Sequence, residues 1–317
     1  MVTIKYSIIL PVYNEEETLP ELYRRLKQVV DGLDGQTEMI FVNDGSQDGS
    51  FQTLGDLAKQ DKRIKVLSFS RNFGHQMAIT AGLDYSSGDA CVVMDADLQN
   101  PPEVIPELIS VWKQGEYEII YASRDRREGE NWFKKTTARL FYSLMQKLSK
   151  TKIPINAGDF RLLDRKVVDA LCSLRECHRF VRGLIDWLGF AQTSVSYEGQ
   201  ARFAGETKYS LYKMVKFALD GITSFSYRPL QLATCLGFLF SIAGFFYAAY
   251  AISINLFTDK TVHGWTSLIV TVLLLGGIQL ITLGIIGEYI GRIFDDVKQR
   301  PLYVVRKKIG FPEEENS

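Results

Sequence analysis

The chain has 317 residues, of which 46% are hydrophobic and 23% are charged, a balance that predicts a packed core and excludes a disordered chain. Lys and Arg together number 37, as do Asp and Glu, so the chain has no net charge and lacks the basic surplus of a general nucleic-acid-binding protein. The charge is unevenly spread, because the segments 232–257 and 265–287 contain no Asp, Glu, Lys or Arg.

The first part of the chain alternates short apolar runs with helical patterns. The runs are continuous and rich in Ile, Val and Phe, which is typical of parallel strands covered on both faces. The predicted strands are Ser7–Val12, Met39–Asn43, Ile64–Phe69, Ala90–Met94 and Glu118–Ala122. The predicted helices are Glu15–Leu33, Ser50–Lys59, His75–Tyr85 and Pro102–Trp112. This alternation predicts a doubly wound, mainly parallel α/β sheet.

Polar residues follow each predicted strand, and this is where ligands bind in such sheets. The pattern G-x-G-x-x-G does not follow the first strand, which argues against a dinucleotide-dependent oxidoreductase. The pattern G-x-x-x-x-G-K-[ST] is absent, which argues against a P-loop nucleotidase.

The sharpest chemical signal is the pair Asp95 and Asp97 at the end of the fourth predicted strand. Two carboxylates at positions i and i+2 can face one cation, and Gln99 could add a carbonyl oxygen. Hard oxygen ligands favour Mg²⁺ or Mn²⁺, which usually share their coordination shell with substrate phosphates. The alternative is a solvated acidic turn, but unpaired carboxylates directly after the apolar run ACVVM would be costly.

Asp44 follows the second predicted strand and has two interpretations. It could accept hydrogen bonds from a nucleobase or a ribose, or it could cap the next helix, since Ser46 and Gly49 are also typical of caps. Asn14 and Glu15 could likewise be a helix cap and a first-turn acid.

The uncharged segments 232–257 and 265–287 predict two transmembrane helices. A helix over the shorter segment would be about 34 Å long, which exceeds a hydrocarbon core of roughly 30 Å. The short connection between them predicts an antiparallel hairpin. Lys and Arg concentrate before the first span and after the second, so the positive-inside rule places the head and both termini in the cytoplasm.

Residues 210–229 carry apolar side chains at helical spacing with charged residues on the other side, which predicts an interfacial amphipathic helix. The alternative is a helix packed on the head. The predicted domains are therefore a head at 1–207, an interfacial segment at 208–229, a two-helix membrane region at 230–291, and a cytoplasmic tail at 292–317.

Several stretches resemble the family-2 glycosyltransferases of the GT-A fold, and they occur in order along nearly the whole chain. The stretches are PVYNEEETLPEL, VNDGSQDGS, MDADLQNPPE, ASRDRREGENWFKKTTARLFYSL, NAGDFRLLDRKV and RFAGETKYSLYKM. The last three are similar to the polyprenyl-phosphate glycosyltransferases, which include dolichyl-phosphate mannose synthases and bactoprenol glucosyltransferases. The tail GEYIGRIFDDVKQRPLYVV and the predicted hairpin resemble the bactoprenol branch.

The resemblance implies roles for individual residues. It implies that Asp97 and Asp159 are catalytic and that Asp95, Asp97 and Gln99 hold the metal, Mg²⁺ or Mn²⁺, with the diphosphate. The residues implied to bind the nucleotide-sugar are Pro11, Tyr13, Glu15, Asp44, Asp95 and Arg124. Those implied to bind the lipid phosphate are Arg124, Arg139, Arg202 and Lys208. Arg and Lys are physically suitable phosphate partners, although a solvated surface charge is the alternative for each.

The implied reaction is transfer of one sugar, with inversion, from a nucleotide-sugar to polyprenyl (undecaprenyl) phosphate at the cytoplasmic face of a bacterial plasma membrane. UDP-glucose is the expected donor. The resemblance also implies a homo-oligomer, of which a tetramer is one form. A processive polysaccharide synthase is an alternative, but the chain lacks the Q-x-x-R-W segment and the many spans of that class. A non-catalytic membrane scaffold that binds nucleotide-sugars is the other alternative.

Physical chemistry limits the role of Asp159. A phosphate monoester has a second pKa of about 6, so near neutral pH it is already largely the anionic nucleophile and needs orientation more than deprotonation. A carboxylate beside it would even repel it unless a cation intervenes. We therefore expect Asp159 to position the sugar or an arginine and not to act as an obligatory base.

Overall fold

The protein is described by a computed structural model that covers residues 4–124, 157–197, 228–257 and 264–312. Three predicted phosphate-binding residues lie outside these ranges, namely Arg139, Arg202 and Lys208. Most of the predicted interfacial segment also lies outside them. The chain divides into two compact units. The head combines Met1–Lys216 with Pro301–Ser317, and the other unit is Phe217–Arg300.

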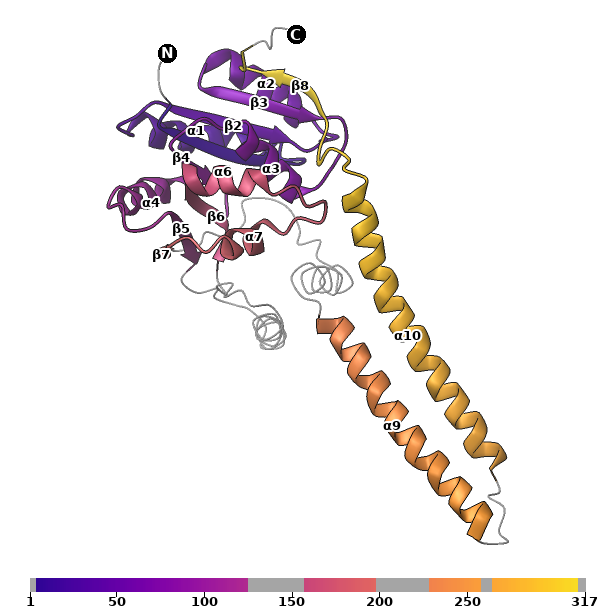
Figure 1. The fold of residues 1–317 in the computed structure, drawn as a ribbon. Coiled ribbons are helices and arrows are strands. Elements are labelled where there is room, and N and C mark those ends of the chain that lie inside the picture. The colour runs from indigo at the N-terminus through magenta and orange to yellow at the C-terminus, as the bar shows by residue number, and fades with distance from the viewer. Residues whose placement is uncertain (1–3, 125–156, 198–227, 258–263, 313–317) are drawn as a thin grey trace. The chain divides into compact units, whose positions relative to one another are not determined.

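Within the described part of the head, eight strands form one sheet in the order β7-β5-β6-β4-β1-β2-β3-β8 (Figure 1). The strands are β1 Tyr6–Val12, β2 Thr37–Asn43, β3 Ile64–Phe69, β4 Ala90–Val93, β5 Ile119–Arg124, β6 Ala157–Asp164, β7 Gln192–Tyr197 and β8 Val305–Ile309. The central strands β4, β1, β2 and β3 run parallel, and β5 pairs with β7 in parallel. Strand β6 is antiparallel to both of its neighbours, and β8 is antiparallel to β3. The predicted mainly parallel α/β sheet is confirmed.

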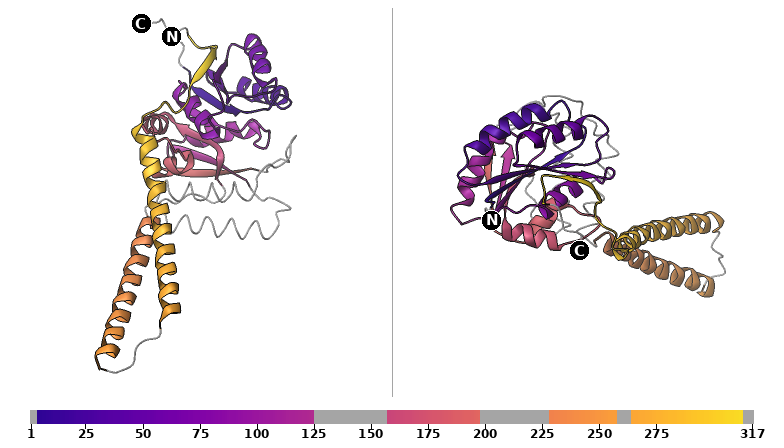
Figure 2. Two further views of the ribbon diagram at one scale, coloured as in Figure 1. Left: turned by 90° about the vertical axis from the view of Figure 1, so that its right-hand side faces the viewer. Right: turned by 90° about the horizontal axis from the view of Figure 1, so that it is seen from above.

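Helices cover both faces of this sheet (Figure 1, Figure 2). They are α1 Leu19–Asp31, α2 Ser50–Gln60, α3 His75–Asp84, the 3₁₀ turn η1 Pro102–Val104, α4 Ile105–Trp112, α6 Arg165–Ser173 and α7 Val181–Trp187. Side chains alternate between the faces of a strand. In β2, Met39 and Phe41 pack with the helices α1, α2 and α4, whereas Ile40 and Val42 pack with α3.

All five predicted strands are confirmed to within two residues at each end. Strands β6, β7 and β8 were not predicted. Each pairs with a strand remote in sequence, and β8 lies in a segment that was interpreted as a tail. The register that creates these strands is set by long-range packing, which a local pattern does not contain.

The first helix begins later than its pattern predicted. Asn14 adopts a left-handed φ of 57°, and α1 starts at Leu19 with Thr18 at the cap position. Neither Asn14 nor Glu15 is therefore a cap or a first-turn acid, and that interpretation was wrong. The polar groups of this loop bond instead to the loop after β2, and the Glu15 backbone N–H donates to Ser50 Oγ at 2.9 Å.

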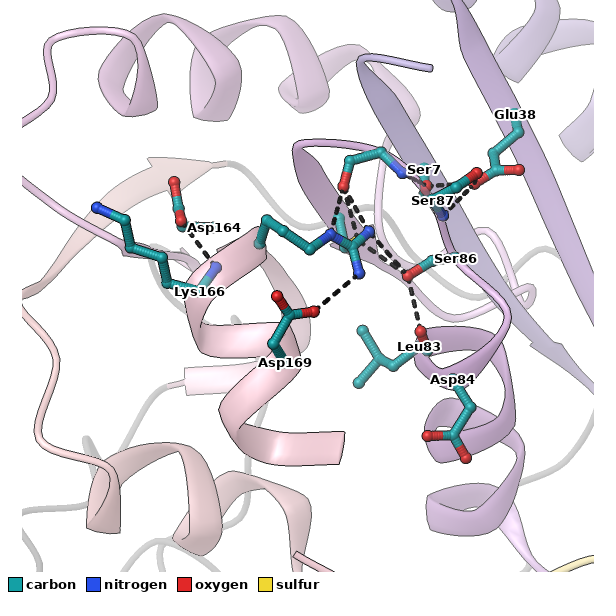
Figure 3. Close-up of polar contacts among 12 residues, drawn as sticks. Ser7, Glu38, Leu83, Asp84, Ser86, Ser87, Asp164, Lys166 and Asp169 are labelled. Atoms are coloured by element: carbon teal, nitrogen blue, oxygen red, sulfur yellow. Dashed lines mark hydrogen bonds and ion pairs between the residues drawn. The ribbon is translucent and has the colours of Figure 1, made fainter. Parts of the chain in front are cut away.

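The amino-terminal edge of the sheet carries a buried polar network (Figure 3). Glu38, only 2% exposed, accepts hydrogen bonds from Ser7 Oγ at 2.5 Å, from the Ser87 backbone N–H at 2.8 Å and from Lys65 Nζ at 2.6 Å. Burial alone would raise the pKa of Glu38, but these donors outweigh it and lower the pKa. The network is structurally complete and stabilises the start of β1, β2 and β4.

The second unit contains the helices α9 Arg228–Phe257 and α10 Trp265–Val297 (Figure 1). Both are long and apolar enough to cross a membrane by length and composition, over Ala233–Ile254 and Leu268–Val297, and neither of these windows is buried within the protein. Large apolar side chains such as Phe245, which is 70% exposed, therefore face outward. Helix α10 continues beyond the predicted end of the second span at residue 287.

The end of the described chain packs in the head. Tyr303 stacks on Phe69 with ring centroids 5.2 Å apart, and its hydroxyl donates to Asp84 at 2.7 Å. Phe311 contacts the edge of Tyr85 at 5.5 Å. Pro301 onward was predicted to be part of a tail beyond the second span, but these contacts and β8 make it part of the head.

Candidate active site

The segment after β4 presents its acidic side chains on one side. Asp95, Asp97 and Gln99 are partly exposed, whereas the alternate residues Ala96 and Leu98 are buried. Leu98 adopts a left-handed φ of 59°, which residues with a side chain rarely do. The Asp97 carboxylate accepts the Gln99 backbone N–H at 3.1 Å within this turn. Backbone strain of this kind often accompanies a functional constraint.

Strand β6 brings Asp159 to the same edge of the sheet. The antiparallel register pairs Val93 with Arg161, so the chain continues toward Asp95 on one strand and toward Asp159 on the other. His75, the first residue of α3, lies between the two carboxylates. Its Nε2 atom is 3.4 Å from Asp95 Oδ1 and 3.2 Å from Asp159 Oδ2. Three segments remote in sequence thus meet at one point.

Arg182 on α7 completes this cluster. Its guanidinium binds the Asp159 carboxylate through two hydrogen bonds, from Nε at 2.6 Å and from Nη2 at 2.9 Å. The start of α7 is fixed to α3, because the Val181 backbone N–H donates to Gln76 Oε1 at 3.0 Å. The arginine that Asp159 holds is therefore Arg182, which sequence reasoning did not identify.

Neither His75 nor Arg182 was selected from the sequence, for different reasons. His75 is the first residue of the helix after the third strand. The rule that ligands bind at this edge would have identified His75 if the rule had been applied to the start of that helix as well. Arg182 sits in a short helix of ordinary composition, and no local pattern marks it.

The pKa values in the cluster reflect burial and neighbouring charges. Burial, together with the nearby charges of Asp159 and Asp97, raises the pKa of Asp95 to about 6, although His75 opposes the rise. Burial would also raise the pKa of Asp159, but hydrogen bonds with His75 and Arg182 outweigh it and hold that pKa well below its usual range. Burial lowers the pKa of His75, but Asp159 and Asp95 reverse the effect and raise it overall.

The cluster can hold a metal ion. One ligand atom each from His75, Asp95 and Asp159 lies within 4.8 Å of the others. This set overlaps the predicted set of Asp95, Asp97 and Gln99 only at Asp95. Carboxylates forced close together are relieved by a divalent cation, so the raised pKa of Asp95 fits such a site.

Four of the residues predicted to bind the nucleotide-sugar lie within or just after β1 and β2, at the same edge. Pro11 is buried within β1, Tyr13 is 45% exposed, and Glu15 is partly buried. The Glu15 carboxylate accepts a hydrogen bond from Thr18 Oγ1 at 2.7 Å. Tyr13 therefore offers an accessible aromatic ring just after β1, the strand next to β4.

Asp44 is almost fully buried, at 3% exposure. Its carboxylate accepts the backbone N–H groups of Phe73 at 2.7 Å and of Gly74 at 3.0 Å, just before α3. The helix after β2 has Gly49 at its cap position, so the interpretation of Asp44 as the cap of that helix was wrong. Burial raises the pKa of Asp44, and the two backbone donors offset this only in part.

The loops after β1 and β2 are joined by reciprocal hydrogen bonds. The Asn14 backbone N–H donates to Ser46 Oγ at 3.0 Å, and the Gln47 backbone N–H donates to Asn14 Oδ1 at 2.8 Å. The Gly49 N–H donates to the Glu16 carboxylate at 2.8 Å. These contacts fix the backbone that follows Tyr13.

Of the predicted phosphate-binding residues, Arg124 alone lies within the described ranges. It is the last residue of β5 and is paired in register with Tyr197 of β7. Its backbone therefore ends β5, on the side of β6 that faces away from β4.

The chain matches two family models. One describes glycosyl transferase family 2 and covers residues 7–172, and the other describes the GtrB C-terminal hairpin and covers residues 228–293. The chain is 55% identical to the Bacillus subtilis glycosyltransferase YkcC over 97% of this chain and 95% of that protein. It is 42% identical to a prophage-derived bactoprenol glucosyl transferase of Shigella flexneri over 96% of this chain and 98% of that protein. Glucosyl-3-phosphoglycerate synthase of Mycobacterium tuberculosis, at 20% identity, superposes over 69% of this chain and 78% of its own with a TM-score of 0.49.

Proposed function

The chain belongs to glycosyl transferase family 2, and we propose that within this family it transfers a single glucose from UDP-glucose to polyprenyl phosphate, such as undecaprenyl phosphate. The observation that carries the proposal is the similarity to the Shigella bactoprenol glucosyl transferase, which extends over the head and the hairpin alike. The acidic cluster at the carboxyl ends of the strands, where α/β sheets bind ligands, supports it independently.

The nucleotide-sugar would lie along the edge formed by β1, β2 and β4. Tyr13 offers a ring for a base to stack on, and Glu15 offers an acceptor for ribose or base N–H and O–H groups. The buried Asp44 would contribute to the nucleotide site by holding the backbone of Phe73 and Gly74. The joined loops after β1 and β2 hold this surface in place, so little ordering entropy is lost on binding.

The diphosphate would lie against Asp95, Asp97 and Gln99. A divalent cation held by these oxygens, with His75 and Asp159 close by, would neutralise the charge that develops on the departing nucleotide diphosphate. Within this turn Asp97 accepts the Gln99 backbone N–H, and Ala96 and Leu98 are buried behind the polar side chains.

The proposed reaction is an in-line displacement. A phosphate oxygen of the lipid forms a bond to the anomeric carbon while the bond from that carbon to the diphosphate oxygen breaks, and the configuration inverts. The lipid phosphate would be bound by Arg124 and by residues outside the described ranges, namely Arg139, Arg202 and Lys208. Because the phosphate is already anionic, positioning supplies most of the rate.

The lipid acceptor requires a membrane, and α9 and α10 supply two helices of suitable length. We place the head and both termini in the cytoplasm, because Lys and Arg flank the outer ends of the two spans. A Thr261→Cys variant should react with an impermeant thiol reagent added to intact cells, and a Ser317→Cys variant should not, with the unsubstituted chain as the background. The reverse pattern would overturn this topology. The predicted homo-oligomer remains a prediction.

The test of function is a transfer assay. Membranes containing the chain are incubated with radiolabelled UDP-glucose, undecaprenyl phosphate and Mg²⁺ or Mn²⁺, and the lipids are separated by thin-layer chromatography. We expect one labelled lipid carrying one glucose, and its loss with a chelator. A ladder of longer products would indicate a processive synthase, and donor binding without any transfer or hydrolysis would indicate a scaffold. Transfer from another nucleotide-sugar in preference would correct the donor alone.

A further inference from the structure

We propose that Arg182 is a positioning residue for glycosyl transfer. Its guanidinium keeps the Asp159 carboxylate oriented and neutralises its charge, so that an anionic acceptor can approach Asp159. The inference rests on the proposed function, because it assumes a phosphate acceptor. Asp159 is 8% exposed at its side chain and Arg182 is 27% exposed. The carboxylate is thus withdrawn from solvent, and water screens its charge poorly.

The two hydrogen bonds of 2.6 and 2.9 Å form a forked contact, which fixes the plane of the carboxylate as well as its position. A lysine at this position would supply a similar charge but could not supply the fork. Orientation and neutralisation are therefore two separate contributions of one side chain, and they can be measured apart.

The support behind Arg182 is rigid. Helix α7 is fixed to α3 through Gln76 at its start and to β7 at its end, where Gln192 Nε2 donates to Asp186 Oδ1 at 2.9 Å. Arg182 thus reaches Asp159 from a helix held at both ends. A residue held in this way is suited to positioning a reactive group and not to following a mobile substrate.

The charges explain why neutralisation is needed. Asp95, Asp97 and Asp159 gather at one edge, and both the donor diphosphate and the acceptor phosphate are anionic. Without Arg182, the buried charge of Asp159 would oppose the approach of the acceptor. The predicted consequence is a higher KM for polyprenyl phosphate, with a smaller change in the KM for UDP-glucose.

The chain offers a matched control. Arg175 also binds a carboxylate through two hydrogen bonds, from Nη1 and Nη2 to Asp84 at 2.7 and 3.0 Å, and the Asp84 side chain is 10% exposed. Asp84 is the last residue of α3 and His75 is the first, so this second pair lies about 14 Å along the helix from the cluster. Arg175→Gln should lower thermal stability and leave both KM values and kcat unchanged.

The experiment compares Arg182→Gln, Arg182→Lys and Arg175→Gln in the full-length chain in lipid vesicles, with UDP-glucose and undecaprenyl phosphate as substrates. For Arg182→Gln we expect kcat/KM for the acceptor to fall about 10²-fold, as for misplacement of a reacting group by about 1 Å. Arg182→Lys should keep the acceptor KM near that of the parent and lower kcat, because charge is retained and orientation is lost. Thermal unfolding of each variant reports folding.

A double-mutant cycle provides the decisive test. If Arg182 acts through Asp159, Arg182→Gln should cost less than about threefold in a chain that already carries Asp159→Asn, since the contact is then absent. This double variant also removes both charges, so it should fold even if Arg182→Gln alone does not. An equal cost in both backgrounds would mean that Arg182 contacts substrate directly, and this would overturn the proposal. Behaviour of Arg182→Gln like that of Arg175→Gln would also overturn it. Absence of transfer by the parent chain would instead refute the proposed function.

Discussion

Buried carboxylates at the two ends of the head's parallel strands differ in their hydrogen bonding and in the direction of their pKa shifts. At the amino-terminal edge, the Glu38 carboxylate accepts four hydrogen bonds, from Ser7, from Lys65 and from both the backbone N–H and the hydroxyl of Ser87, and its pKa is lowered despite burial. At the carboxyl-terminal edge, Asp95 faces other carboxylates, and its pKa is raised to about 6. The charge of Glu38 is compensated by donors within the protein, whereas the repulsion between Asp95 and its neighbouring carboxylates can be relieved by a cation or a ligand.

This difference indicates that the amino-terminal edge of the sheet stabilises the fold and that the carboxyl-terminal edge binds ligands. At the amino-terminal edge, the donors come from adjacent strands and the turn before β4, so the network needs no further component (Figure 3). At the other edge, strands end and side chains project beyond the ladder. A substitution at the first edge should therefore change stability, and one at the second should change catalysis.

The largest expected effect is that of Asp97→Asn on catalysis. The amide keeps the shape of the side chain and removes its charge, so folding should persist while kcat falls about 10²–10³-fold. The measurement is lipid glucosylation with Mg²⁺ or Mn²⁺ present. Asp56→Asn, at an exposed carboxylate paired with Lys59 on α2, is the matched control and should be neutral. Normal turnover by Asp97→Asn in the presence of a chelator would remove Asp97 from the site.

The converse effect is expected for Glu38→Gln. Loss of the charge leaves Lys65, whose side chain is 17% exposed, without its ion-pair partner, so the free energy of unfolding should fall by roughly 3 kcal/mol. The kcat of the molecules that remain folded should not change. Thermal unfolding of the purified full chain and transfer at a permissive temperature measure the two quantities. A change in kcat without a change in stability would contradict the view that the amino-terminal edge stabilises the fold and has no part in catalysis.

A smaller effect is expected for Asp159→Asn. If Asp159, held by Arg182, orients a substrate group and does not accept a proton, the variant should be about tenfold slower. That loss is below the upper range of about 10⁴-fold for loss of a general base. Its pH–rate profile with saturating lipid should match that of the parent chain. Restoration of the rate at high pH, or disappearance of the acid limb, would identify Asp159 as a base.

The smallest effect concerns the pH dependence of stability at the amino-terminal edge. The pKa of Glu38 is lower in the folded chain than in the unfolded chain, so its stabilisation is present above the unfolded value of about 4.3 and is lost as the pH falls through the folded value. The stability difference between the parent chain and Glu38→Gln should therefore be constant near pH 7 and shrink below about pH 4. A difference that grew on acidification would show that the pKa of Glu38 is raised instead.

Much of the head could be predicted because its strands are locally distinctive. The predicted strand Ile64–Phe69 has the same first and last residues as β3, because a continuous apolar run bounded by polar residues leaves few alternatives. The antiparallel additions were missed for the opposite reason. Strand β8 is VRKKI, a mostly charged edge strand whose pairing with β3 depends on Tyr303 and Phe311 packing beside it.

The sequence by itself determined the α/β class, the apolar hairpin and the acidic segment after β4, because strand periodicity, the length of uncharged runs and a carboxylate pair are all local features. The tertiary structure alone decided which groups meet that segment. His75, Asp159 and Arg182 are far apart along the chain and join only because β6 runs antiparallel beside β4 and α7 is fixed across it. Charge compensation acts through space, so the partner of a buried carboxylate is set by packing and not by its neighbours in sequence.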